Sequence, residues 1–178
     1  QLDGYAGTIG SGNLEITSEC IERPTNDNIC QAATAAVGQT PFTNDLAGAQ
    51  VGEPAPPGTG CDDQNGWCEP FIQNSVWYTI VAPASGWINV GIGALDIDLQ
   101  LALYSVGDCN DFESFDLVAA NDDGGVGSAP LIKSAVVAPS ETYYIQLDGY
   151  FGTNSSGFLE ITSECSSGQP SPSPTLTG

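Results

Sequence analysis

The chain contains one segment twice. Residues 1–20 read QLDGYAGTIGSGNLEITSEC and residues 146–165 read QLDGYFGTNSSGFLEITSEC, so sixteen of twenty positions are identical at an offset of 145. Identity at this level indicates a duplicated folding unit. The unit therefore runs from residue 21 to residue 165, and residues 1–20 are a second copy of its last part.

Each copy has the pattern of two strands around a turn. Apolar and polar residues alternate over 143–147, the run GYFGTNSSG supplies turn residues, and Phe158 and Ile161 follow. This pattern predicts a β-hairpin in each copy. An isolated hairpin is marginally stable in water. We therefore expect residues 1–20 to dock on their own chain or on a neighbour, through the side chains of Leu2, Tyr5, Leu14 and Ile16.

The region between the copies reads as all-β. Gly (22) and Pro (12) are abundant and charged residues make up only 13%, which favours short strands joined by turns. Leu99, Leu101 and Leu103 show the strand alternation most clearly. Residues 30–37 (CQAATAAV) are the best helix candidate. The predicted strands are 75–83, 86–94, 98–105, 116–122 and 128–139.

This pattern divides the chain into three parts. Residues 1–20 are the duplicated segment, either a donor to another subunit or the stub of a preceding repeat, and residues 21–165 are a β-sandwich domain. Residues 48–70 within the domain are too rich in Pro and Gly for regular structure. Residues 166–178 (SSGQPSPSPTLTG) form a Pro/Ser/Thr linker or tail that favours extended geometry.

The charge balance excludes some partners. The chain has 22 acidic residues against two basic ones, Arg23 and Lys133, and a net charge of −20. Such a chain repels the phosphates of nucleic acids and anionic membrane surfaces. The sequence has no apolar run of about 18 residues, so we expect no membrane insertion. Divalent cations would relieve the self-repulsion.

Two acidic segments suggest a Ca²⁺ site. Asp96 and Asp98 lie two apart at the start of a predicted strand, so both side chains emerge on one face. Asn121, Asp122 and Asp123 precede the Gly124-Gly125 turn. If the two loops meet at one end of the sandwich, they offer several oxygen ligands, which Ca²⁺ prefers. The alternative is that these side chains cap their own turns by hydrogen bonds to the backbone.

Six cysteines in a small Gly-rich chain indicate disulfides and an extracellular setting. Proximity favours Cys61–Cys68, then Cys20–Cys30, which leaves Cys109–Cys165. However, Cys20 and Cys165 are repeat equivalents and should have equivalent partners, so this assignment is not consistent with the duplication.

Trp67 lies in the predicted loop and is our candidate for contact with a partner, whereas Trp77 and Trp87 lie in strand patterns, and at least one should be core.

The chain has no histidine, which rules out a Ser-His-Asp triad and Cys/Cys/His zinc sites. Paired carboxylates capable of glycoside hydrolysis carry little weight, because 22 acidic residues make some close pair inevitable. We expect no enzymatic activity.

The segments NDNICQAA, VWYTIVAPASGWINV, DIDLQLALYS, LVAANDD and SETYYIQLDGYFGTNSSGFLEI follow one another in an order that resembles the bacterial pre-peptidase C-terminal domain group over residues 26–162. The most specific matches are the Trp77-Tyr78 pair, the Asp–Leu–Tyr strand, the Asn121-Asp122-Asp123 triplet and the Tyr-Tyr-Ile-Gln strand. The resemblance implies a jelly-roll-like β-sandwich, often repeated in secreted enzymes and surface proteins, that binds or spaces rather than catalyses. Some relatives carry a cysteine just before the triplet, where this chain has Ala119 and Ala120, which leaves the partner of Cys109 open.

The sequence thus predicts an all-β, jelly-roll-like antiparallel β-sandwich with an extra N-terminal hairpin segment. We interpret the chain as a non-catalytic subunit or repeat of a bacterial extracellular fibre or cell-surface protein, with copies of itself as partners through β-strand contacts. A second interpretation is a Ca²⁺-dependent module of a tandem array that binds polysaccharide or a cell surface. A third is part of a secreted hydrolase.

Overall fold

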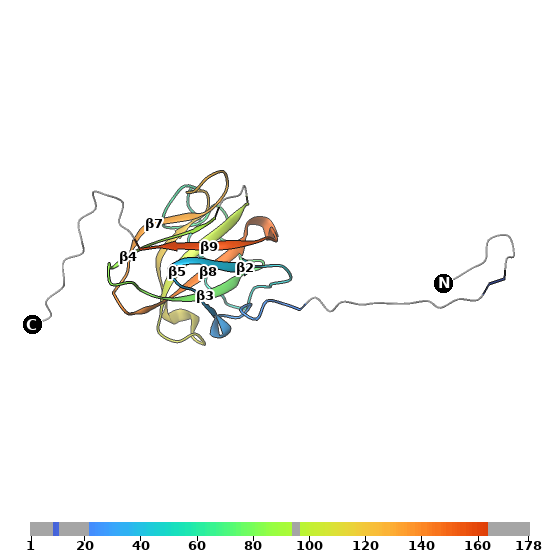
Figure 1. Cartoon of the computed structure of the whole chain (residues 1–178), viewed down its shortest axis with the longest axis horizontal. Coiled ribbons are helices and arrows are strands. Elements are labelled where there is room, and N and C mark those ends of the chain that lie inside the picture. The colour runs from blue at the N-terminus through green and yellow to red at the C-terminus, as the bar shows by residue number, and fades with distance from the viewer. Residues whose placement is uncertain (1–8, 11–21, 94–96, 164–178) are drawn as a thin grey trace, which may run out of the picture.

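The computed structural model describes residues 9–10, 22–93 and 97–163, in which two β-sheets pack as a sandwich (Figure 1). Sheet A has the order β1-β3-β8-β5-β6 and sheet B the order β2-β9-β4-β7. All pairs are antiparallel except β1–β3. The predicted all-β antiparallel sandwich is confirmed. The strands are β1 (Ala33–Thr34), β2 (Gly38–Thr43), β3 (Val76–Val81), β4 (Trp87–Ile92), β5 (Leu99–Val106), β6 (Phe115–Asn121), β7 (Leu131–Val136), β8 (Thr142–Gly149) and β9 (Ser156–Thr162).

The helix predicted over residues 30–37 is wrong. A single 3-10 turn, η2 (Ile29–Gln31), stands there, and Ala33–Thr34 then pair with β3 as the short strand β1. Ile29 and Ala35 are buried, and the Ala35 N–H donates to the carbonyl of Thr79 in β3 at 2.8 Å. Tertiary pairing therefore overrides the helix propensity of this Ala-rich run.

The hairpin predicted over residues 146–165 is also wrong. Strand β8 pairs with β3 and β5 in sheet A, whereas β9 pairs with β2 and β4 in sheet B. The chain crosses between the sheets through the 3-10 turn η4 (Tyr150–Gly152). Gly149 stands at this crossing, and a Cβ there would collide with the carbonyl oxygen of Thr153. The duplicated sequence thus encodes the end of one strand and the whole of another in the opposite sheet.

The inner core fills the space between the two sheets. Leu99, Leu101 and Leu103 of β5 are fully buried in it, as their alternation predicted. This alternation places every second side chain on the inner face of its sheet. Other buried members from both sheets include Val76, Tyr78, Ile80, Ile88, Val90, Ile132, Ile145, Leu147, Leu159 and Ile161.

The outer layer covers the opposite face of sheet A. Its buried cluster combines Trp77 and Tyr104, from the strands, with Ile29 and Trp67 from segments that fold over the sheet. Trp67 is completely buried and donates its indole Nε1–H to the carbonyl oxygen of Leu101 at 2.8 Å. The expectation that Trp67 is exposed for a partner is therefore wrong. Trp77 and Trp87 are both buried, so the expectation for these two is confirmed.

Polar side chains also lie buried in the outer layer. The Asp148 Oδ1 accepts hydrogen bonds from the backbone N–H groups of Gln73 and Asn74, at 3.1 and 2.8 Å. Glu53 accepts from the Ser75 hydroxyl at 2.6 Å and from the indole N–H of Trp77. These carboxylates fasten the long loop between β2 and β3 to the outer face of sheet A.

Two disulfides lie in this layer. Cys61–Cys68 is confirmed, but Cys30 pairs with Cys109, so the predicted pairs Cys20–Cys30 and Cys109–Cys165 are wrong. Cys30 and Cys109 are 79 residues apart in sequence, and only the folding of η2 and the loop after β5 brings their Cα atoms to 5.2 Å. Cys20 and Cys165 lie outside the described residues. Disulfides of this kind are typical of an oxidising, extracellular environment.

The open edges of sheet B are blocked. Pro41 lies in the middle of the edge strand β2, and proline lacks the N–H that an added strand would need. On the edge strand β7, the Gln64 amide accepts from the Lys133 N–H at 2.8 Å and donates to the Leu131 carbonyl at 3.2 Å. This amide thereby mimics a neighbouring strand, and such devices prevent edge-to-edge aggregation.

Candidate metal centre

The predicted Ca²⁺ ligands divide into those that meet and those that do not. Asp98 precedes β5 and Asp122 follows β6. Because these strands are antiparallel neighbours, the start of β5 and the end of β6 lie at the same end of sheet A. One carboxylate oxygen from each of Asp98, Asp122 and Asp123 lies within 4.8 Å of the others. We call these three residues the acidic cluster. Asp96 lies outside the described residues.

Asp122 is the most unusual member of the cluster. Its side chain is fully buried, and its Oδ2 accepts from the Cys68 N–H at 2.9 Å and from the Gln100 amide at 3.1 Å. Its Oδ1 has no hydrogen-bond partner. Burial raises the pKa of Asp122 above its ordinary value. A buried carboxylate oxygen without a partner is costly, and a bound cation would satisfy it.

Negative charges around Asp123 also favour the binding of a cation at the acidic cluster. Burial, and then the charges of Asp122 and Asp62, raise the pKa of Asp123. Of the two basic side chains, Arg23 contacts Asp27 at 3.0 Å, and Lys133 Nζ donates to the carbonyl of Gly124, next to Asp123, at 2.6 Å. Three convergent carboxylates suit a hard cation such as Ca²⁺, which takes six to eight oxygen ligands.

Asn121 has a different role from the one predicted. Its amide oxygen accepts from the backbone N–H groups of Gly124 and Leu131, at 2.8 and 2.7 Å, and its Nδ2 donates to the Asp63 carbonyl at 2.9 Å. The side chain is fully buried and holds the turn together. For this residue the turn-capping alternative describes the contacts, and we do not retain it as a ligand.

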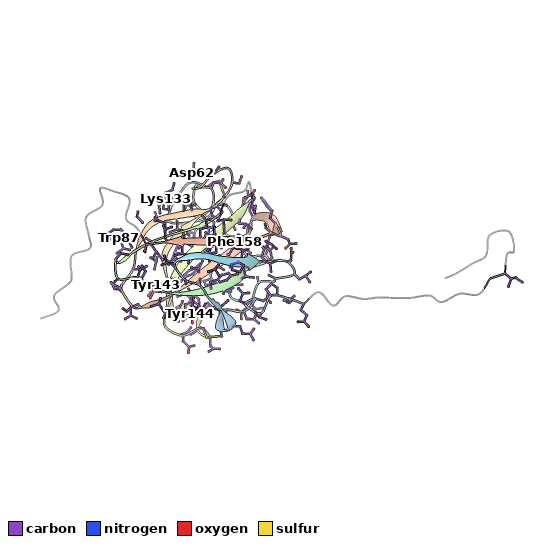
Figure 2. The ribbon with its side chains drawn as sticks, in the orientation of Figure 1. Asp62, Trp87, Lys133, Tyr143, Tyr144 and Phe158 are labelled. Atoms are coloured by element: carbon purple, nitrogen blue, oxygen red, sulfur yellow. A yellow bond between two sulfur atoms is a disulfide. The ribbon has the colours of Figure 1, made fainter. Side chains whose placement is uncertain are left out.

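A second group of possible ligands, Cys61, Cys68 and Asp123, also lies close together. The two sulfur atoms form a disulfide and are therefore not thiolate ligands. The disulfide instead fixes the loop whose backbone reaches the cluster, since the Asp123 N–H donates to the Cys61 carbonyl at 2.9 Å. Asp62 is exposed on this loop (Figure 2).

Sequence reasoning missed two buried residues beside the cluster. The register of sheet A places Gln100 opposite Asp148, and the Gln100 amide contacts Asp122. The Gln100 Oε1 and the Asp148 Oδ2 are buried without hydrogen-bond partners. Burial is the largest cause that raises the pKa of Asp148, to about 7. In the sequence both residues alternate with leucines and read as solvent-facing, so no signal marked them.

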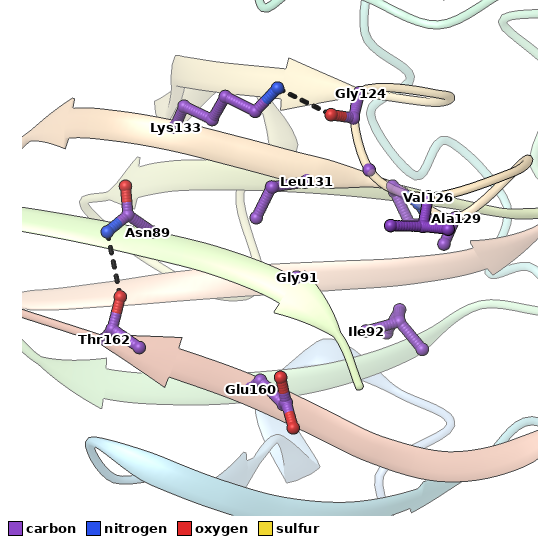
Figure 3. Close-up of a pocket in the computed structure, with 12 residues that line it drawn as sticks. Asn89, Gly91, Ile92, Gly124, Val126, Ala129, Leu131, Lys133, Glu160 and Thr162 are labelled. Carbon is purple, nitrogen blue, oxygen red and sulfur yellow. Dashed lines mark hydrogen bonds between the residues drawn. The ribbon is translucent and has the colours of Figure 1, made fainter. Parts of the chain in front are cut away.

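A cavity of ≈ 520 Å³ lies on sheet B, and its lining includes the Gly124-Gly125 turn that follows Asp123 of the acidic cluster (Figure 3). Its floor includes Gly91, Ile92 and Leu131, and Lys133 and Glu160 stand at its rim. Asn89 donates to the Thr162 hydroxyl at 2.8 Å across one end. The lining is mainly apolar and has no convergent carboxylates, so it does not resemble a metal site.

The predicted partner-binding residues Leu2, Tyr5, Leu14 and Ile16 lie outside the described residues. Their equivalents at the offset of 145 are described: Leu147, Leu159 and Ile161 are fully buried, and Tyr150 is half-buried.

No protein-family model matches the chain, and no curated protein is significantly similar to it. Among the described residues, no helix is long and apolar enough to cross a membrane. The class that the fold defines is thus an all-β sandwich.

Proposed function

We propose that the chain is a non-catalytic structural subunit or repeat of an extracellular fibre or surface protein, joined to its neighbours by β-strand contacts. One observation carries this proposal. Every buried position of residues 146–163 is occupied by the identical residue in the N-terminal copy. These positions are Gln146, Leu147, Asp148, Gly149, Leu159 and Ile161.

The differences between the copies support the same conclusion. They fall at Phe151, Asn154, Ser155 and Phe158, which are replaced by Ala6, Ile9, Gly10 and Asn13 in the N-terminal copy. Three of these positions are exposed in the domain and Ser155 is half-buried. The N-terminal copy therefore keeps the side chains that burial requires and varies only where the surface permits.

The blocked edges indicate where such a copy would fit. An extra strand added to sheet B would meet Pro41 on β2 and the Gln64 amide on β7. Residues 11–17 correspond instead to the whole of β9, which lies between β2 and β4. We propose that this segment takes the place of β9 in a sandwich of the same kind, in a neighbouring subunit or in a preceding repeat. Repeated head-to-tail contact of this type gives an open-ended assembly.

The experiment replaces Leu14 and Ile16 by aspartate in the full chain. If residues 11–17 act as a strand, L14D/I16D should prevent assembly, whereas the melting temperature of the domain should stay the same because Leu159 and Ile161 are untouched. Glu15→Gln is the control, since its equivalent Glu160 is only half-buried. Light scattering and electron microscopy give the assembly state. Fibres of normal length from L14D/I16D would contradict donation between subunits.

Other features support a structural function in an extracellular setting. The chain has no histidine, and its single lysine bonds a backbone carbonyl. The two disulfides suit an oxidising compartment. We propose, on the resemblance of residues 26–162, that the module is related to the bacterial pre-peptidase C-terminal domain group and is not part of a hydrolase.

A second candidate function is favoured by the acidic cluster. We propose that Asp98, Asp122 and Asp123 bind Ca²⁺, in a module that attaches to polysaccharide or to a cell surface. The unpartnered, fully buried Oδ1 of Asp122 is the observation behind this proposal.

Thermal melting with Ca²⁺ and with chelator tests the metal. A ligand at 100 times its dissociation constant stabilises the folded state by ~2.7 kcal/mol, and Asp122→Asn should abolish the gain. Asp116→Asn, an exposed carboxylate on β6, is the control and should keep it. A shift no larger than that of sodium chloride at equal ionic strength would leave turn capping as the role of these residues.

A further inference from the structure

The corner between the two sheets carries two aromatic residues in an unusual conformation. Tyr150 and Phe151 form η4, and their rings meet edge to face with centroids 4.5 Å apart. Phe151 has φ 47° and ψ 33°, the left-handed region that a bulky side chain rarely adopts. Its side chain is nevertheless 69% exposed. The fold therefore holds Phe151 in a strained conformation and gains little burial in return.

In the duplicated segment the position equivalent to Phe151 does not hold an aromatic residue. The N-terminal copy keeps Tyr5 where the domain has Tyr150, but it has Ala6 where the domain has Phe151. Backbone strain that the packing does not require is commonly stored at functional sites. A contact outside the fold would account for Phe151.

Tyr150 connects this corner to the acidic cluster. Its backbone N–H donates to the Asp98 carbonyl at 3.3 Å. Tyr150 is therefore adjacent to Asp98 of the acidic cluster, and Phe151, with its exposed ring, follows directly.

We propose that Tyr150 and Phe151, together with a Ca²⁺ ion at Asp98, Asp122 and Asp123, form a binding site for a neutral polysaccharide. This inference rests on the calcium site proposed above. An aromatic ring packs against the apolar C–H face of a sugar. Three carboxylates leave coordination positions of Ca²⁺ open, and adjacent sugar hydroxyls supply oxygen ligands for them.

The surroundings select this class of ligand. A purely apolar partner would strip water from the neighbouring carboxylates without replacing their hydrogen bonds, which is costly. An anionic polymer would be repelled by a protein with a net charge of −20. A neutral sugar polymer presents both an apolar face and hydroxyl oxygens.

The duplication supplies a matched pair of variants for the test. Phe151→Ala and Phe158→Asn each introduce the residue of the N-terminal copy at an exposed aromatic position. Phe158 lies on β9 in sheet B (Figure 2) and is 49% exposed. Both variants should fold, because each replaces an exposed side chain. Only Phe151→Ala removes a ring at the proposed site.

Binding of the full chain to mannan, dextran and cellulose is measured in Ca²⁺ and in chelator. We expect the unaltered protein to bind at least one of them in Ca²⁺ only. Phe151→Ala should weaken binding at least tenfold, and Phe158→Asn should not weaken it. The Ca²⁺-dependent shift in melting temperature, measured on the same samples, should be unchanged in Phe151→Ala.

Each failure has its own meaning. Binding to none of the three polymers, full binding by Phe151→Ala, or binding that persists in chelator would overturn the polysaccharide site while leaving the Ca²⁺ shift intact. Loss of self-association in Phe151→Ala without any change in polymer binding would make Phe151 a contact between copies instead. Absence of the Ca²⁺ shift itself would refute the metal proposal and, with it, this inference.

Discussion

The two faces of sheet A are both buried, but by different means. The inner core joins sheet A to sheet B through aliphatic side chains such as Leu101 and Ile161. The outer layer covers the other face with a long loop, aromatic rings and buried polar groups such as Asp122 and Asp148. Hydrophobic burial is insensitive to pH and metal ions, whereas a buried carboxylate depends on both. One face should therefore give the sandwich its stability, and the other should make it responsive to its surroundings.

The largest effect should come from the inner core. Leu101→Ala removes a fully buried side chain and should lower the free energy of unfolding by about 2–5 kcal/mol. Because Leu101 lies on the face away from the carboxylates, the loss should be the same in Ca²⁺ and in chelator. Urea denaturation in both conditions checks this. A loss that depended strongly on Ca²⁺ would show that the two faces are not independent.

A smaller effect should appear in the pH dependence of the outer layer. Burial is the main cause that raises the pKa of Asp148 to about 7, above its ordinary value of 3.8. Between these values the folded protein retains a proton that the unfolded chain releases, so stability should fall as the pH rises from about 4 to about 7. The charge on buried Asp148 should then cost at least ~1.4 kcal/mol, the free energy of one pKa unit.

Asp148→Asn should remove most of this slope, because an amide keeps an oxygen for the N–H groups of Gln73 and Asn74 without titrating. Melting temperatures from pH 4 to pH 8 in chelator give the comparison. Glu141→Gln, an exposed carboxylate before β8, is the control and should keep the slope. An unchanged slope in Asp148→Asn would assign the pH dependence to other groups.

The inner core could be predicted from the sequence and the outer layer could not. The alternation of Leu99, Leu101 and Leu103 identified β5 and its inner face. The same alternation marked Gln100 as solvent-facing, but the loop before β3 covers it. A strand pattern states which side chains share a face, not whether another segment lies over that face. Trp67 was misjudged for the same reason, since its loop folds inward.

Long-range connections were also beyond sequence reasoning. The residues of 146–162 have the alternation and turn of a hairpin, yet β8 and β9 belong to different sheets, because local pattern does not specify pairing partners. The pairing Cys30–Cys109 joins segments 79 residues apart. The acidic cluster was more accessible, because antiparallel neighbours place the start of β5 beside the end of β6.

Amide hydrogen exchange in Ca²⁺ and in chelator tests the central claim most directly, since it measures the stability of both faces separately. We predict that Ca²⁺ slows exchange at residues 61–69 and 121–124, around the acidic cluster, by at least tenfold. In β4 and β9, which contribute to the inner core, exchange should change much less. Equal changes in both regions, or none around the acidic cluster, would contradict the proposed division of the molecule into a core that does not respond to Ca²⁺ and an outer layer that does.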